Sequence, residues 1–270
     1  MKNKTQICLP NFLKPNFKTN LLRVGKKNDG GYCIPRSSLK KTSILYSFGL
    51  NDDWSFEKEF REKSGAKIIC FDHSVTLIFW IKRFIKDLIQ FFLLKESIKQ
   101  ITKRFFTFFT YKIFFSKPNI EHRKLFFGQI NHQNNYQAFP QIIDMSTILK
   151  KWEDKNYFMK VDIEGGEYKV LDQIIKYQNN LTGLAIEFHN CDLMLEKIRL
   201  FVKTFDLDLV HLHVNNYGSV NKEGFPSVLE LTFSPKSDNI KREQNDNIFP
   251  VPSLDQPNNK NHEDLNIRFY

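Results

Sequence analysis

Residues 157–171 read YFMKVDIEGGEYKVL and decide the fold. A short, mostly apolar run is followed by Asp162 and Glu164, then by two glycines and Glu167. This order predicts a buried strand, a tight turn and a helix that begins near Glu167. Acids also stabilise the first turn of a helix, so Glu164 and Glu167 could serve the helix alone. Asp162 precedes the glycines and is the better candidate for a ligand site, because α/β sheets bind ligands at the carboxyl ends of their strands.

Similar apolar runs recur along the chain and predict further strands. They lie at 43–50, 66–73, 124–130, 181–189, 208–216 and 226–234. Helical patterns lie at 55–64, 146–155, 167–178 and 192–205. The alternation predicts an α/β fold around a mostly parallel seven-stranded sheet. The connection NYGSVNKEGF (216–225) is too short for a crossover helix, so we expect a hairpin and an antiparallel last strand.

Composition favours an intracellular protein with one large domain. The chain has 270 residues, 41% of them hydrophobic, which is enough for a substantial core. Its four cysteines lack the spacing of a zinc site or a disulfide framework, and its start lacks a signal-peptide pattern. We therefore expect a cytoplasmic protein in which residues 1–235 form the domain. Residues 236–270 read as a polar tail that is partly packed on it.

The net charge of +10 is concentrated in one insert. Residues 76–117 contain nine Lys or Arg and two acids, and their apolar residues follow three-four spacing. This pattern predicts one or two amphipathic helices, and uncharged runs of about seven residues are too short to span a bilayer. The favoured interpretation is a helical cap docked on the domain, and a segment peripheral to a membrane is the alternative. Nucleic acid fits poorly, because the charge is interleaved with phenylalanines.

Candidate cofactor residues follow the first two strands. Gly49 allows a tight turn after the first strand, and Asp53 precedes the next helix. Asp72 follows the second strand, 23 positions beyond Gly49, where an acid holds ribose hydroxyls in nucleoside-binding sheets or simply caps a helix. Because the motif G-x-G-x-x-G is absent, a nucleoside without a pyrophosphate fits better than a dinucleotide.

Candidate catalytic residues follow the later strands. His189 ends the fifth strand, and we expect it to face Asp162 as a base beside its orienting partner. His213 in the sixth strand is a second candidate base, although a strand histidine is often structural. Asp162, Glu187 or His189 could hold Mg²⁺ or Mn²⁺, but the pattern does not require a metal.

Several motifs resemble one enzyme family. VDIEGGEYKVL is similar to the K-[IV]-D-[IV]-E-G-x-E signature of FkbM-type S-adenosylmethionine-dependent methyltransferases, and LYSFGLNDDWSFEKEF resembles their divergent first motif. NDGGYCIP and PSLDQPN resemble flanking segments of one branch. The likeness covers about 23–258 outside the insert. Ser47 departs from it, because many methyltransferases carry an acid at that position.

The resemblance implies a class I methyltransferase-like fold with S-adenosylmethionine as cofactor. It also implies methyl transfer to a hydroxyl oxygen, commonly on a sugar or natural product. With the strand-end residues, it predicts Asp162, His189 and His213 as catalytic. Gly49, Asp53, Asp72, Asp162 and Glu164 are the predicted cofactor contacts. The alternative is a non-catalytic membrane-surface or glycan-binding module on a degenerate methyltransferase fold.

Overall fold

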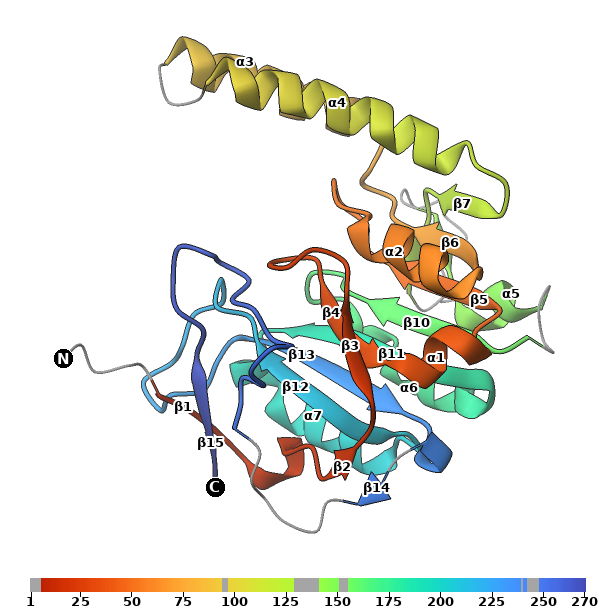
Figure 1. The fold of residues 1–270 in the computed structure, drawn as a ribbon, viewed down its shortest axis with the longest axis vertical. Coiled ribbons are helices and arrows are strands. Elements are labelled where there is room, and N and C mark those ends of the chain that lie inside the picture. The colour runs from red at the N-terminus through yellow and green to blue at the C-terminus, as the bar shows by residue number, and fades with distance from the viewer. Residues whose placement is uncertain (1–5, 94–96, 129–140, 151–154, 239, 242–247) are drawn as a thin grey trace.

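A seven-stranded sheet forms the centre of the protein. The computed structural model describes residues 6–93, 97–128, 141–150, 155–238, 240–241 and 248–270. The sheet has the strand order β12-β13-β11-β10-β5-β6-β7 (Figure 1). Its strands are β5 (Ile44–Phe48), β6 (Lys67–Phe71), β7 (Ile120–Arg123), β10 (Tyr157–Val161), β11 (Leu181–His189), β12 (Asp208–Val214) and β13 (Val228–Ser234).

One strand of this sheet runs against the others. β13 pairs antiparallel with both β11 and β12, and every other pairing in the sheet is parallel. The strand order reverses between β5 and β10, so the carboxyl ends of these strands form a topological switch point. The predicted mostly parallel α/β sheet with one antiparallel strand is therefore confirmed.

The third predicted strand, 124–130, was wrong. The sheet instead uses Ile120–Arg123, whose residues after Ile120 are only half-buried. β7 is an edge strand with one neighbour, so it does not need apolar residues on both faces. Within the predicted segment, Phe126–Phe127 forms β8 and pairs with β9 (Ile142–Ile143), while 129–130 lie outside the described residues.

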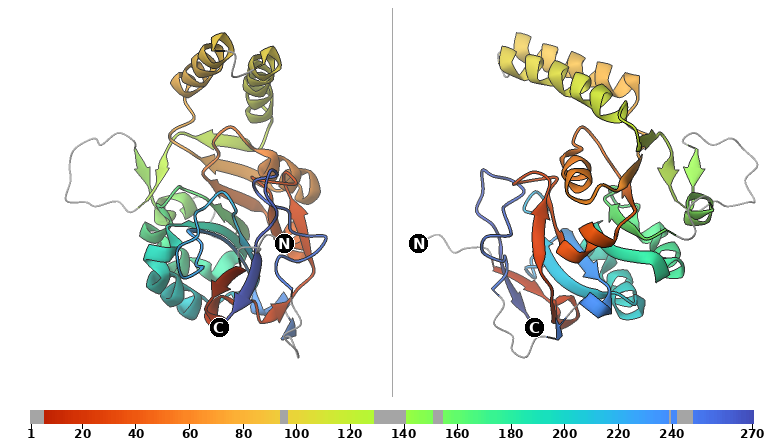
Figure 2. Two further views of the ribbon diagram at one scale, coloured as in Figure 1. Left: turned by 90° about the vertical axis from the view of Figure 1, so that its left-hand side faces the viewer. Right: turned by 45° about the vertical axis from the view of Figure 1, so that its right-hand side comes forward.

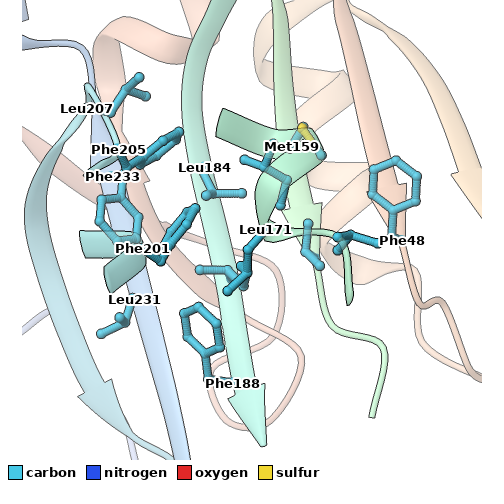
Figure 3. Packing of buried hydrophobic residues seen from close by; sticks show 14 of the residues in the cluster. Phe48, Met159, Leu171, Leu184, Phe188, Phe201, Phe205, Leu207, Leu231 and Phe233 are labelled. Atoms are coloured by element: carbon cyan, nitrogen blue, oxygen red, sulfur yellow. The ribbon is translucent and has the colours of Figure 1, made fainter. Parts of the chain in front are cut away.

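Helices cover both faces of the sheet. On one face lie α1 (Arg36–Lys41) and α2 (Ser55–Ser64), and on the other α5 (Met145–Leu149), α6 (Leu171–Lys176) and α7 (Cys191–Thr204). Side chains alternate between two hydrophobic clusters: Tyr46 and Phe48 join the cluster of α6 and α7, while Leu45 joins that of α2. Figure 3 shows part of the first cluster. Of the predicted helix 146–155, residues 151–154 lie outside the described part.

Short strand pairs tie the chain ends to the body. β3 (Leu21–Val24) and β4 (Tyr32–Pro35) form the hairpin around NDGG. β1 (Gln6–Leu9) pairs in parallel with β15 (Asn266–Phe269), and β2 (Phe17–Lys18) pairs with β14 (Ile240–Lys241). In the tail, Phe249 is buried and Ile248 is 70% exposed.

The insert forms two helices, α3 (Leu77–Phe92) and α4 (Ile98–Phe115), which project from the body as a hairpin (Figures 1 and 2). Only the base of the hairpin joins the core, through Trp80, Tyr111 and Phe114. The structure therefore does not dock these helices over the domain as a cap, which was the favoured interpretation. None of the helices in the described ranges combines the length and hydropathy needed to cross a bilayer.

Candidate functional site

A cavity of about 700 Å³ opens at the carboxyl ends of the parallel strands. It collects six of the seven residues predicted for the site, which follow β5, β6, β10 and β11. They are Gly49, Asp53, Asp72, Asp162, Glu164 and His189. The cavity therefore lies at the topological switch point, where α/β sheets bind ligands.

The turn after β10 is shaped by its glycines and by a buried acid. Glu164 and Gly165 both adopt positive φ values, 53° and 94°, so the chain reverses sharply beside the cavity. Glu167 is fully buried, and its Oε1 accepts hydrogen bonds from the amides of Ile163 (3.0 Å) and Gly165 (3.2 Å). Glu167 therefore stabilises the turn from its buried side. From the sequence, it was considered for a role at the helix N-terminus.

His189 is held by acids on both ring nitrogens. Its Nδ1 lies 3.1 Å from Oε1 of Glu167, and its Nε2 lies 3.5 Å from Oε2 of Glu164 and 3.9 Å from Oε1 of Glu187. Burial opposes the charged imidazolium, but the hydrogen bond and charge of Glu167 outweigh it and raise the pKa of His189 to about 9. In the free protein, His189 is therefore a cation at neutral pH.

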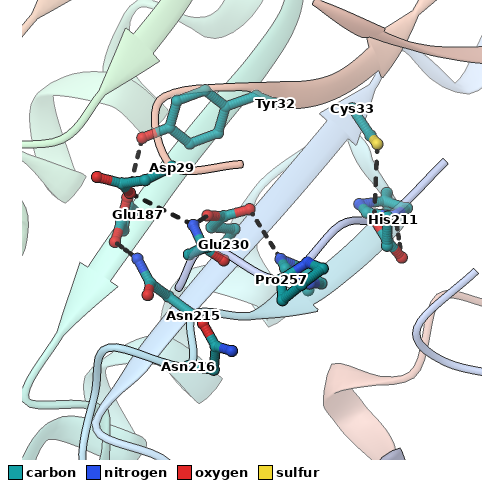
Figure 4. A network of polar contacts seen from close by, with 12 residues as sticks. Asp29, Tyr32, Cys33, Glu187, His211, Asn215, Asn216, Glu230 and Pro257 are labelled. Carbon is teal, nitrogen blue, oxygen red and sulfur yellow. Dashed lines mark hydrogen bonds and ion pairs between the residues drawn. The ribbon is translucent and has the colours of Figure 1, made fainter. Parts of the chain in front are cut away.

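Tyr32 joins the two carboxylates of neighbouring strands. Its hydroxyl lies 3.0 Å from Oδ2 of Asp162 and 2.9 Å from Oε2 of Glu187 (Figure 4 shows the latter contact). Burial and the charge of Asp162 raise the pKa of Glu187 well above its usual range. The Tyr32 hydroxyl has a single proton, so it donates to one of these two carboxylates at a time. Asn215 completes the contacts of Glu187 by donating to its Oε1 (2.8 Å).

Lys160 fixes the turn after β5 from beneath. Its side chain is buried, and Nζ donates to the carbonyl oxygen of Gly49 (2.9 Å). Burial opposes its charge, but the carboxylates of Glu57 and Asp162 outweigh this and raise the pKa of Lys160. Gly49 has φ of 84°, and a Cβ there would lie 1.6 Å from the carbonyl oxygen of Asp162. The strand ends thus approach too closely for any other residue.

Asp72 lines the cavity, but its carboxylate oxygens already accept hydrogen bonds from neighbouring groups of its own chain. Oδ2 accepts from the amides of Leu50 (2.9 Å) and Asn51 (3.0 Å), and Oδ1 from the amide and hydroxyl of Ser74. Burial opposes the charge of Asp72, but these four bonds lower its pKa. A carboxylate has about four acceptor positions, so a ribose hydroxyl would have to displace one of these donors.

Asp53 is also held by its own chain. Its Oδ1 accepts from the amide of Ser55 (2.9 Å), and its Oδ2 pairs with Lys26 Nζ (2.8 Å). Lys26, Asp29 and Gly30 of the β3–β4 loop line the cavity beside it. The NDGG hairpin loop therefore forms one wall of the site.

His213 is not brought to the cavity, unlike the other predicted residues. It is buried, with Nδ1 3.2 Å from Glu230 and Nε2 3.1 Å from Asp264. Burial opposes its charge, but these carboxylates raise its pKa well above the usual range. A histidine that is saturated by two acids holds the tail to the sheet and is unsuited to act as a base, which corrects its prediction as catalytic.

Two groups of described residues have the spacing of metal ligands. Asp162, Glu164 and His189 offer ligand atoms within 4.8 Å of one another, as do Cys33, His211 and Asp255. The first set faces the cavity and has the oxygen and imidazole donors that suit Mn²⁺ or Mg²⁺. The second is buried, and there His211 and Asp255 already form an ion pair at 3.0 Å.

The cavity is acidic although the chain is basic. Its lining includes two lysines, Lys26 and Lys160. The acids that line it are Asp29, Asp52, Asp53, Glu57, Asp72, Asp162, Glu164 and Glu187. Near Asp72 the wall becomes aromatic, with Phe71, Phe126 and Phe127. The cavity therefore suits a ligand with a cationic group and a flat apolar ring.

Tyr32, Glu57 and Lys160 were not singled out from the sequence. Lys160 gave a local signal, because a lysine inside an otherwise apolar strand needs a buried acid as partner. Glu57 gave none, since acids are common in the first turn of a helix. Tyr32 approaches Asp162 only through the packing of β4 on the sheet.

No protein-family model matches the chain, and no curated protein matches it in sequence. The FkbM-type resemblance therefore stays a prediction. Among solved structures, the fold is similar to a Galdieria sulphuraria protein described as a "putative sarcosine dimethylglycine methyltransferase". The two share 10% identity and a TM-score of 0.33, over 74% of this chain and 80% of that chain. A likeness of this size identifies neither the family nor the activity of the chain.

Proposed function

We propose that the protein is a class I methyltransferase that uses S-adenosylmethionine to methylate a hydroxyl oxygen, on a carbohydrate or glycoconjugate. The observation that carries the proposal is the acidic cavity at the β5/β10 switch point, lined by residues from the motifs that resemble FkbM-type enzymes. The sequence resemblance supports the acceptor class.

The cavity fits this cofactor in size and charge. Its volume of about 700 Å³ lies within the range of small-molecule sites. Its carboxylates would stabilise a sulfonium and an ammonium group, and Phe126 and Phe127 would pack against an adenine ring. Oε2 of Glu57, a residue that lines the cavity, is buried and has no hydrogen-bond partner among the described residues. Asp72 would accept a hydrogen bond from a ribose hydroxyl only if one of its four present donors moved away.

The cofactor would supply the methyl group, and the chain would align the hydroxyl and remove its proton. Asp162 is held by Tyr32 and would orient the acceptor beside His189. His189 would accept the hydrogen bond of the acceptor hydroxyl and take its proton as the methyl group bonds to the oxygen, which requires that His189 first lose its own proton. We therefore expect methyl transfer to accelerate as the pH rises towards about 9.

A transfer assay with radiolabelled cofactor and a glycan extract of the host tests the proposal. Wild type should label the extract. His189→Ala should lose transfer yet still bind S-adenosylhomocysteine, while Glu196→Ala on an exposed part of α7 should behave as wild type. Full transfer by His189→Ala would remove His189 as the base, and no labelling by wild type would count against this acceptor class.

A second candidate is a non-catalytic glycan-binding or membrane-surface module on a degenerate methyltransferase fold. The filled acceptors of Asp72 and the serine at position 47 favour it. Glycan binding without any binding of S-adenosylhomocysteine would support this candidate over the enzyme.

A further inference from the structure

α3 and α4 form an antiparallel hairpin. Specific contacts join the two helices along their facing sides, which form the inner seam. Trp80 packs on Tyr111 with ring centroids 5.4 Å apart, and Asp87 accepts a hydrogen bond from Nε of Arg104 (2.9 Å). These two pairs run in opposite directions along the helices, so α3 and α4 are antiparallel in register. Asp87 is buried in this seam. The hairpin therefore has a fixed inside, and apart from its base and the contacts of Arg83 and Arg104 with Asp52 it stands away from the body in the views of Figure 2.

Each helix carries an exposed apolar stripe at helical spacing. The stripe residues are 45% to 78% exposed. They are Ile78, Ile81, Ile85, Ile89 and Phe92 on α3, and Ile98, Phe105, Phe109 and Ile113 on α4. The spacing of three, four or seven residues places each set on one side of its helix. Large apolar side chains gathered in this way mark an interaction surface.

Both stripes are rotated from the seam in the same sense. On α3, Ile81 directly follows the inner residue Trp80. On α4, Phe105 directly follows the inner residue Arg104. An axis that relates two antiparallel helices keeps these two positions on one side of the hairpin. We call the nine residues of the two stripes the apolar face.

Basic side chains border the apolar face. α3 and α4 together contain seven Lys or Arg and one Asp. Lys82 and Lys86 line one pocket with Ile85 and Ile89, and Lys112 follows Phe105 by seven positions on the same side of α4. Lysines that border exposed apolar side chains place their ammonium groups among lipid headgroups while the apolar side chains enter the bilayer, as in helices that lie in a membrane interface.

We propose that the apolar face binds the surface of an anionic lipid bilayer, with both helices lying in the plane of the interface. Charge favours an anionic bilayer over a second copy of the chain as the partner of this face. A dimer through this face would bring together two hairpins that each carry a surplus of six positive charges, whereas anionic lipids neutralise them. Nucleic acid would use the lysines and leave the apolar face exposed.

The hairpin is also coupled to the cavity. Arg83 of α3 binds Oδ2 of Asp52 (2.5 Å) and Oδ1 of Asn51 (2.8 Å), and Arg104 of α4 binds Asp52 as well. Asn51 and Asp52 line the cavity. Membrane attachment therefore fixes the orientation of the cavity relative to the bilayer.

Flotation with vesicles tests the proposal, using the full chain and vesicles of phosphatidylcholine with or without about a third phosphatidylglycerol. Wild type should float with the anionic vesicles, less at high salt, and much less with neutral ones. Ile85→Glu/Phe109→Glu should weaken binding more than about tenfold, because each buried apolar side chain contributes roughly that factor. Both positions are about half exposed, so folding should survive, as a melting curve would check.

Leu193→Glu/Leu200→Glu is the matched control, because it adds the same charges at two exposed leucines of α7. It should float as wild type does. The proposal is overturned if wild type ignores anionic vesicles, or if the two double variants lose binding equally. It is also overturned if sedimentation equilibrium shows a dimer that Ile85→Glu/Phe109→Glu dissociates while vesicle binding is unchanged.

Discussion

His189 Nδ1 lies 3.1 Å from Oε1 of Glu167, a carboxylate with no exposed surface. The same oxygen accepts the amides of Ile163 and Gly165, so one buried atom shapes the turn after β10 and orients the imidazole at the end of β11. The remaining nitrogen, Nε2, is left to face Glu164 and the cavity. The carboxylate of Glu167 therefore holds the turn after β10 and the ring of His189 together.

The first prediction concerns the charge of His189. Glu167→Gln keeps an oxygen for the two amides but removes the negative charge that stabilises the imidazolium. The pKa of His189 should fall from about 9 by about one unit or more, because an adjacent opposite charge typically shifts a pKa by that much. A titration of the imidazole by NMR measures this without substrate.

Glu164→Gln is the control for that titration. Glu164 is 81% exposed and solvent screens its charge, so its removal should shift the pKa of His189 less than Glu167→Gln does. A wild-type midpoint near 6.5, or equal shifts in the two variants, would contradict the role given to Glu167.

The second prediction concerns the buried pair beneath the Gly49 turn. Lys160→Met leaves the carboxylate of Glu57 buried beside an apolar side chain and should lower the free energy of unfolding by about 3–5 kcal/mol. Glu57→Gln in the same chain removes the stranded charge and should restore part of the loss. Urea unfolding at pH 7 measures both.

The pair Lys63 and Glu59 on α2 provides the comparison. Both side chains are partly exposed at 3.4 Å, and Lys63→Met should cost no more than about 1 kcal/mol. If Lys160→Met costs as little, or if adding Glu57→Gln destabilises it further, Lys160 does not hold the turn through this pair.

The third prediction concerns how stability depends on pH. Burial opposes the charge of His211, but Asp255 outweighs it and raises the pKa of His211 to about 10. Since this pKa is higher in the folded than in the unfolded chain, the pair stabilises fully below about pH 6.5, and its contribution is lost between 6.5 and about 10. The pKa of Asp255 is lowered to about 2, so the contribution also fades below about pH 4.

Asp255→Asn separates this pair from the other histidines. The variant should lose about 3–5 kcal/mol of the free energy of unfolding at pH 6.5 and clearly less at pH 10. Unfolding curves at several pH values measure the difference. A loss that stays constant across this range would mean that the charge of His211 does not depend on Asp255.

The sequence predicted the parallel strands because each is buried on both faces and must be apolar along its length. It failed at Ile120–Arg123, because an edge strand tolerates polar residues and the neighbouring 124–130 is more apolar. Turns at strand ends were also readable, since Gly49 and Asp162 mark them locally.

The position of a site residue was predictable from the sequence only where the strand that precedes it determines that position. Asp162 and His189 end adjacent parallel strands, so their meeting at one edge follows from topology alone. The structural role of His213 depends on its contact with Asp264, which lies 51 positions away in the tail. No local sequence pattern indicates that contact. The projection of the α3–α4 hairpin likewise depends on packing at its base.

Calorimetric titration of the purified full chain with S-adenosylhomocysteine tests the central claim most directly. Wild type should bind one equivalent. Asp72→Ala should bind it far more weakly, because the amides of Leu50 and Asn51 lose their acceptor at the cavity, while Glu196→Ala should bind as wild type does. No heat of binding with folded wild type, or unchanged binding by Asp72→Ala, would contradict a cofactor site in this cavity.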